Sequence, residues 1–206
     1  MDILPGLLTI ITMHFLGVIS PGPDFALVVK NALTKSRQHA LATSLGVSSG
    51  LMIHISYCIF GLDLLLNNSP KTFKIIKTIG GIYLLYLSIQ SLRAARAHQQ
   101  DPKLHAQQAQ TLFKAFLEGF VCNLLNVKAI LFILFLFSIV IEPATTHLLK
   151  TFYGVIMVLI TLSWFVALSF LISIPKFKQQ LFKSQALIHV LFGAILGSLG
   201  IFVLAS

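Results

Sequence analysis

The chain has 206 residues, of which 56% are hydrophobic and 10% are charged, and its formal net charge is +9 at pH 7. Soluble domains contain about 25% charged residues, so this chain is too poor in charge to cover a water-exposed surface and its solvent is predicted to be lipid. The positive charge therefore indicates short basic loops beside an anionic bilayer rather than binding of nucleic acid. Cys58 and Cys122 form no CxxC pair, which leaves disulfide exchange and zinc binding without support.

A helix needs about 20 mostly apolar residues to cross a bilayer. Six stretches of the sequence meet this requirement. In chain order they are roughly residues 3–29, 40–62, 73–92, 117–141, 151–174 and 186–204. The first has no Lys or Arg before its apolar run and no small-residue cleavage site, so we expect a retained span rather than a signal peptide. The third begins with Lys74 and Lys77, whose long side chains can reach the headgroups. The prediction is an all-α, polytopic membrane helix bundle.

The loops between these stretches differ in charge. The first, third and fifth loops carry ten Lys and Arg residues, whereas the opposite side of the membrane carries only four, Lys71, Lys74, Lys77 and Lys150. Cytoplasmic loops of membrane proteins are enriched in Lys and Arg. We therefore expect the odd-numbered loops to face the cytoplasm and both termini to face outward.

The longest loop, residues 93–113, is basic and divides one domain of 1–206 into two halves, approximately residues 1–92 and 112–206. Each half begins with a span that contains a polar interruption and ends with a span that carries glycines. Because each half has an odd number of spans, the two would insert with opposite orientations. Inverted three-helix repeats with matching broken helices are typical of secondary transporters that bind their substrate near the middle of the membrane.

The first interruption is Ser20-Pro21-Gly22-Pro23-Asp24. Two prolines remove two backbone donors and their rings clash with the preceding turn, so the helix should kink or unwind here. An unwound turn offers carbonyl oxygens to an ammonium group, and the helix that resumes offers its N-terminus to a carboxylate. These are the two charged groups of a zwitterion. A kink that serves only helix packing is the alternative.

Asp24 places a carboxylate inside an apolar span. An ionisable group in the membrane costs roughly 2.5–3.5 kcal/mol on insertion scales and therefore marks a functional-site candidate. Three roles are open to it. It could bind a substrate ammonium, carry a proton, or only cap the resumed helix, since Asp is favoured at helix starts.

Lys128 lies about ten residues from either end of the fourth span, roughly 15 Å along a helix and too far for its ammonium to reach the surface. It needs an aqueous cavity or an anionic partner, and Asp24, Glu118 or a substrate carboxylate could supply the anion. Asn123 and Asn126 precede it, yet Asn126 and Lys128 would lie about 160° apart on a regular helix. That mismatch indicates a second broken segment.

Other polar and small residues carry weaker signals. His14 and His54 could relay protons, but a lone His in a membrane bundle is more often a packing residue, and we expect that role for both. The GxxxG pairs at 46–50 and 193–197 allow close helix approach, either within one protomer or between protomers of a homo-oligomer.

The hexapeptide Ser20-Pro21-Gly22-Pro23-Asp24-Phe25 resembles the first-helix signature of the LysE family of amino-acid exporters and is most similar to its homoserine/threonine-resistance (RhtB) branch. Asn126-Val127-Lys128 stands where that family has a phrase like Asn-Pro-Lys. The sequences Gly81-x-Tyr83-Leu84 and Gly193-Ala194 also match the family pattern, and the resemblance runs nearly end to end. Because Val127 replaces the proline, we expect a milder second break.

The resemblance implies export of a small neutral amino acid, such as threonine or homoserine, from the cytoplasm across a bacterial inner membrane, coupled to the proton gradient. It implies no cofactor. We expect Asp24 near the substrate ammonium and Lys128 near its carboxylate. The candidate substrate-binding or coupling residues are Pro21, Gly22, Pro23, Asp24, Asn123, Asn126 and Lys128.

Two other classes of function remain open. One is an ion or metal exporter on the same bundle, although the spans hold few carboxylates and no His/Cys/Asp cluster with metal-ligand spacing. The other is a membrane protein that transports nothing, such as an assembly partner or a membrane enzyme. No paired acid and base and no activated nucleophile favours the enzyme.

Overall fold

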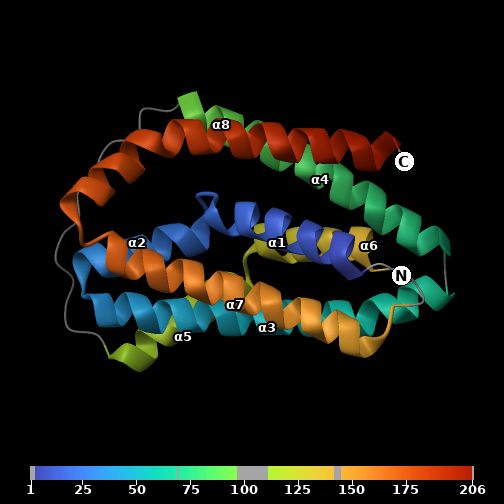
Figure 1. Cartoon of the computed structure of the whole chain (residues 1–206), viewed down its shortest axis with the longest axis horizontal. Coiled ribbons are helices and arrows are strands. Elements are labelled where there is room, and N and C mark those ends of the chain that lie inside the picture. Colours follow the sequence, from blue (N-terminus) through green and yellow to red (C-terminus); the bar gives the residue numbers. More distant parts are fainter. Residues whose placement is uncertain (1–2, 69, 97–110, 142–144, 206) are drawn as a thin grey trace.

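The structure is a computed structural model that describes residues 3–68, 70–96, 111–141 and 145–205. These residues form helices and short connections without any strand, which confirms the predicted all-α bundle. Figure 1 shows the helices running side by side along the long axis of the molecule. They are α1 (Ile3–Ile19), α2 (Pro23–Thr34), α3 (Arg37–Asn68), α4 (Pro70–Arg96), α5 (Leu112–Leu124), α6 (Val127–Val140), α7 (His147–Leu171) and α8 (Pro175–Ala205).

Several helices are long and apolar enough to cross a membrane. Helices α3 and α7 qualify alone, and the described residues give up to five spans when each bent helix pair counts as one. The structure does not describe the side chains of Lys74, Lys77 and several other residues in the first half of α4. The predicted contact of these lysines with the headgroups therefore lies outside the described residues. The first residues of α1 and the last of α8 lie at the same end of the bundle, which is the arrangement that the six predicted spans require (Figure 1).

Two element boundaries differ from the sequence prediction. Helix α4 continues to Arg96 and α5 begins at Leu112, so the predicted loop 93–113 is shorter at both ends, and residues 97–110 lie outside the description. Helix α7 begins at His147, which places Lys150 in its first turn with a buried side chain rather than in the fourth loop.

The first break separates α1 from α2 at residues 20–22 and bends the chain by 54°. Helix α1 ends where the Ser20 amide donates to the Leu16 carbonyl, and α2 begins with Pro23 after an extended Gly22. Proline is favoured in the first turn of a helix because its missing N–H would have no partner there. The Pro-Gly-Pro sequence therefore produces the unwound turn that was predicted.

The second break, between α5 and α6, bends the chain by 57°. The second break is therefore as sharp as the first, although Val127 stands in place of the proline. The physical reason is Asn126, whose extended backbone and side-chain oxygen cap α6 by accepting the Lys128 amide at 3.1 Å. A cap of this kind starts a helix without help from proline. Val127 occupies the first helical position and is 55% exposed, so its side chain points away from the core.

Close packing of α3 on α5 fixes the position of the second break. A Cβ atom added at Gly46 would collide with the backbone oxygen of Phe116, and one at Gly119 would collide with the backbone oxygen of Thr43. Gly50 likewise approaches Asn123. The GxxxG pair at 46–50 thus acts within one chain, where it lets two backbones touch.

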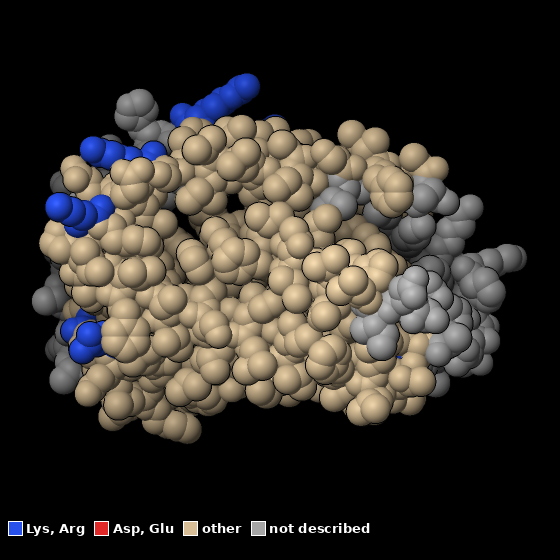
Figure 2. Space-filling model, viewed as in Figure 1, with Lys and Arg blue, Asp and Glu red and all other residues tan. Residues whose placement is uncertain are grey.

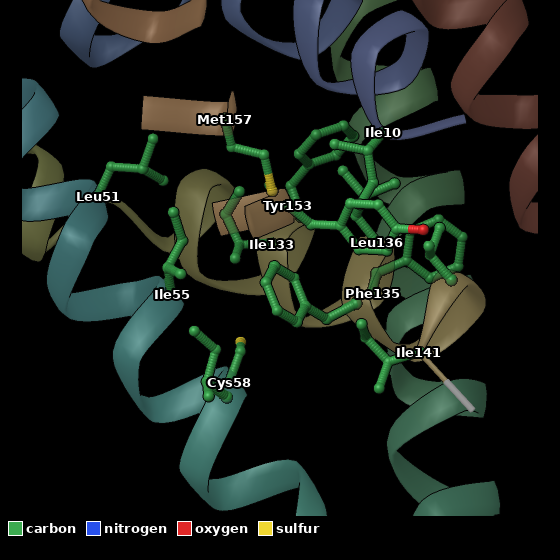
Figure 3. Close-up of a cluster of buried hydrophobic side chains, with 14 of the residues drawn as sticks. Ile10, Leu51, Ile55, Cys58, Ile133, Phe135, Leu136, Ile141, Tyr153 and Met157 are labelled. Atoms are coloured by element: carbon green, nitrogen blue, oxygen red, sulfur yellow. The ribbon is translucent and has the colours of Figure 1, made fainter. Parts of the chain in front are cut away.

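Buried apolar side chains form two clusters. In the larger one, Ile10, Leu51, Ile133 and Met157 converge from α1, α3, α6 and α7 (Figure 3). The smaller cluster joins α2, α3 and α7 around residues such as Val28. Helices α4 and α8 pack along each other and meet the remaining helices mainly through α6 and α3. The two breaks lie where the two clusters approach each other, because residues of both clusters line the cavity described below.

On the face shown in Figure 2, Lys and Arg side chains gather towards the end of the bundle where α2 meets α3 and α7 meets α8. This is the end that carries the first and fifth loops. These cations agree with the basic first and fifth loops of the sequence.

The contact between α3 and α5 generates a prediction about stability. Replacing Gly46 with Ala should lower the unfolding free energy by about 1–3 kcal/mol, the usual cost of overpacking, because backbone rather than a flexible side chain meets the new methyl group. Thermal unfolding of the purified protein in detergent measures the change.

The matched control is Gly61→Ala, in the same helix. No atom lies within 4 Å of a Cβ added there, so this variant should keep or slightly raise the wild-type unfolding temperature, because alanine is the better helix former. Equal unfolding temperatures for the two variants would contradict the packing described here.

Candidate functional site

A cavity of about 60 Å³ lies between the two breaks. One water needs only about 10–15 Å³, so the cavity has room for several waters or a small polar ligand. Of the predicted site residues, Gly22, Asp24, Asn123, Asn126 and Lys128 line it. The two prolines at 21 and 23 do not; they produce the bend that exposes the cavity wall. The breaks are far apart in sequence, and the fold brings them together.

Asp24 is held by the second break. Its Oδ2 accepts hydrogen bonds from Asn123 Nδ2 and Asn126 Nδ2, each at 2.9 Å. The N-cap of α2 is Gly22, and no side chain caps that helix. The interpretation of Asp24 as a mere helix cap is therefore wrong. Its carboxylate still benefits from the positive end of α2, whose first turn it occupies.

Lys128 is held in turn by the first break. Its Nζ donates to the Ser20 carbonyl oxygen at 3.3 Å and also to the Ser20 hydroxyl. It lies over the ring of Phe192 in α8, 4.8 Å from the centroid, where the π-electrons attract a cation. Of the partners that the sequence suggested, Glu118 is excluded, because its carboxylate pairs with Lys35 at 3.2 Å.

Asp24 and Lys128 form no direct ion pair within the described structure. Both nevertheless line the same cavity. Two opposite charges removed from water usually pair with each other, since each needs compensation. Here neutral polar groups hold each charge in place, and the space between them stays open to a ligand.

Three atoms around the cavity accept hydrogen bonds but have no partner among the described residues. They are Asp24 Oδ1, Asn123 Oδ1 and His14 Nδ1, and all three are buried. A buried acceptor without a partner costs about 1–3 kcal/mol, so such atoms usually meet a donor. Waters in the cavity, or a ligand that carries several N–H or O–H groups, would satisfy these acceptors.

His14 belongs to this site although the sequence analysis assigned it to packing. It is 2% exposed, and its Nε2 lies 3.0 Å from the Met157 carbonyl oxygen and 2.8 Å from Thr161 Oγ1. Spacing offers a signal, because His14 and Gly17 are three residues apart on α1 and both line the cavity that Ser20, just after the helix, also lines.

His54 takes the structural role that was expected. Its Nε2 lies 2.9 Å from the Asn123 carbonyl oxygen and its Nδ1 lies 3.0 Å from the Tyr57 hydroxyl. Both ring nitrogens thus have partners. The contact steadies the end of α5 that carries Asn123.

The cap at the second break yields a prediction. Asn126→Ala should lower the unfolding free energy by about 1–2 kcal/mol, because it removes both the cap of α6 and a hydrogen bond to Asp24. Val127→Pro should leave it nearly unchanged, since the first helical position accepts proline and the extended Asn126 backbone suits a residue before proline. Thermal unfolding in detergent distinguishes the two variants.

Thr146→Ala serves as the control, because Thr146 caps α7 outside the cavity. It should cost stability without weakening ligand binding. If Val127→Pro destabilises the protein as much as Asn126→Ala does, Asn126 is not what sets the break.

Comparison with known proteins shows which family this chain resembles. The profile of the family described as LysE type translocator matches residues 15–206. The chain is 30% identical to the threonine efflux protein of Salmonella typhi over 200 residues. This alignment covers 96% of this chain and 97% of the relative. The chain is 27% identical over 201 residues to the threonine efflux protein of Escherichia coli K12, with 97% of each chain covered. No solved structure matches it significantly.

A further relative is the uncharacterized membrane protein YrhP of Bacillus subtilis, 28% identical over 202 residues, which cover 95% of this chain and 96% of the relative. The family match includes both breaks and every residue that joins them. It confirms the resemblance and sets the chain among transporters rather than enzymes. The chain is a multi-pass membrane protein that belongs to the LysE family of translocators.

Proposed function

We propose that this protein exports a small neutral amino acid of the threonine or homoserine type from the cytoplasm. The observation that carries the proposal is the pair of opposite charges, Asp24 and Lys128, which line one cavity without pairing with each other. A zwitterionic amino acid supplies the two missing counter-charges at once. The names of the threonine efflux relatives support the same class of substrate.

The ammonium group of the substrate would lie beside Asp24. Asp24 Oδ1 and Asn123 Oδ1 are two buried acceptors that no described residue satisfies, and an ammonium group has three hydrogens to donate. The carboxylate of the substrate would lie beside Lys128, whose ammonium is anchored on Ser20. Hydrogen bonds to charged groups are about twice as strong as neutral ones, so both contacts would contribute to affinity.

The rest of the cavity favours a substrate with an uncharged side chain. Its walls are largely apolar, with Val18, Phe25, Leu51, Phe132 and Phe165 among them. Besides Asp24 and Lys128, the described lining contains only His14 as a titratable group. A third charge on the substrate would thus be buried without an opposite charge, which is costly.

Transport would follow from movement of the two halves around this cavity. Inverted repeats predict that a contact within the bundle recurs with the halves exchanged. Under this symmetry α1, α3 and α4 correspond to α5, α7 and α8. The contact of α3 with α5 then has its counterpart in the contact of α7 with α1, and the contacts α3–α7 and α4–α8 each join a helix to its own counterpart. The two bends, of 54° and 57°, fall at matching places in the two halves. We infer that the halves rock and expose the cavity to each side in turn.

The remaining features belong to the same proposal. The protein would lie in a bacterial inner membrane with its odd-numbered loops in the cytoplasm and both termini outside, as the positive-inside rule indicates. Export would be coupled to the proton gradient, with Asp24 as the carrier because it is the carboxylate in the cavity. The bacterial relatives support the location.

Efflux from preloaded cells tests the function. Cells that express the chain should release labelled threonine and homoserine faster than control cells, and a protonophore should abolish the difference. Asp24→Asn and Lys128→Met should each slow export about tenfold or more, because each removes a charged contact worth about 1.5–3 kcal/mol, and 1.4 kcal/mol corresponds to a factor of ten.

Lys30→Met is the matched control, since Lys30 is an exposed cation on the same helix as Asp24 and does not line the cavity. It should export at the wild-type rate. If Asp24→Asn and Lys128→Met, at normal abundance, also export at that rate, the proposal is wrong. Tolerance of metal salts without release of any amino acid would favour a metal exporter instead.

A further inference from the structure

We propose that His14 recognises the hydroxyl group on the side chain of the substrate and thereby selects hydroxylated amino acids over apolar ones of the same shape. The inference rests on the proposed function and names the residue that sets its specificity. It starts from His14, the one titratable side chain in the described cavity lining that neither charged contact of the substrate uses.

The hydrogen bonds of His14 determine which ring nitrogen is free. A carbonyl oxygen accepts hydrogen bonds only, so Nε2, 3.0 Å from the Met157 carbonyl oxygen, must carry the hydrogen. Thr161 Oγ1 at 2.8 Å can accept the same hydrogen. In the neutral ring the other nitrogen, Nδ1, is then an acceptor. It is buried and has no partner among the described residues.

The position of His14 suits a contact with the far end of a small amino acid. His14 precedes Ser20 by six residues on α1, which corresponds to about 9 Å along the helix axis. Ser20 anchors Lys128, which would hold the substrate carboxylate. The ring therefore lies beyond the charged contacts, at a distance on the order of the length of a small amino acid.

The chemistry around His14 makes a hydroxyl the matching group. The ligand atom that meets Nδ1 must donate a hydrogen bond, and besides the Thr161 hydroxyl the same cavity is lined by apolar groups such as those of Leu51 and Phe132. A hydroxyl is a neutral donor and suits both conditions. A methyl group in its place would leave Nδ1 buried without a partner, and sites built to bind a hydroxyl reject such analogues strongly.

Two other roles for His14 lead to different expectations. A packing role would make the loss of the ring equally harmful to every substrate. A proton relay would change the dependence of transport on pH without changing the preference between substrates. Only recognition of the hydroxyl changes the ratio between a hydroxylated ligand and its apolar analogue.

Equilibrium binding to the purified protein in detergent measures that ratio with labelled L-threonine and with L-valine, in which a methyl group replaces the hydroxyl. The wild-type protein should bind threonine at least tenfold more tightly than valine. His14→Phe, which keeps an aromatic ring but has no acceptor, should weaken threonine binding at least tenfold and leave valine binding within about threefold. His14→Asn, whose Oδ1 can take the place of Nδ1, should retain part of the preference.

Unfolding temperatures of both variants show whether they are folded, and the substrate ratio is unaffected by the amount of folded protein. A parallel loss of threonine and valine binding in His14→Phe, or an unchanged ratio, would overturn the assignment. A wild-type protein that binds amino acids without preference for the hydroxyl would overturn it while leaving the proposed function intact. A wild-type protein that binds neither ligand would contradict both.

Discussion

The structure depends on a reciprocal arrangement at the two broken helices. The carboxylate of Asp24 in the first break is held by Asn123 and Asn126 of the second, and the ammonium of Lys128 in the second is held by Ser20 of the first. Each break thus stabilises the charge that the other introduces into the membrane. Because neutral groups make these contacts, the two charges remain separate and the cavity between them can accept a ligand of opposite polarity at each end.

Much of this architecture follows from local rules. Apolar length predicts the spans, and Pro21 and Pro23 break the first of them wherever it packs, because proline lacks an amide hydrogen. The mismatch between Asn126 and Lys128 on a regular helix indicated the second break without any structure. The resemblance of the first motif to the LysE family is confirmed over nearly the whole chain. The spans and the helix breaks, which depend on short segments of the chain, can therefore be predicted from the sequence.

Contacts between residues that are far apart in the sequence could not be predicted in this way. The sequence left Asp24, Glu118 and a ligand as equal partners for Lys128, whereas the structure gives it Ser20 and Phe192, which α1 and α8 bring to it. The sequence did not place His14 at the cavity, because Met157 and Thr161, its hydrogen-bond partners on α7, are remote in sequence. The sequence analysis also did not foresee that the side chain of Asn126 caps α6 at the second break, where the family pattern has a proline one position later.

The central claim is that the cavity binds both charged ends of one amino acid, with Asp24 at the ammonium and Lys128 at the carboxylate. Its most direct test compares the affinity of the purified protein for L-threonine, N-acetyl-L-threonine and L-threonine amide. In the wild-type protein both analogues should bind at least tenfold more weakly than threonine; Asp24→Asn should lose discrimination only against the acetylated ligand, and Lys128→Met only against the amide. Equal binding of either analogue and threonine to the wild-type protein would contradict the account.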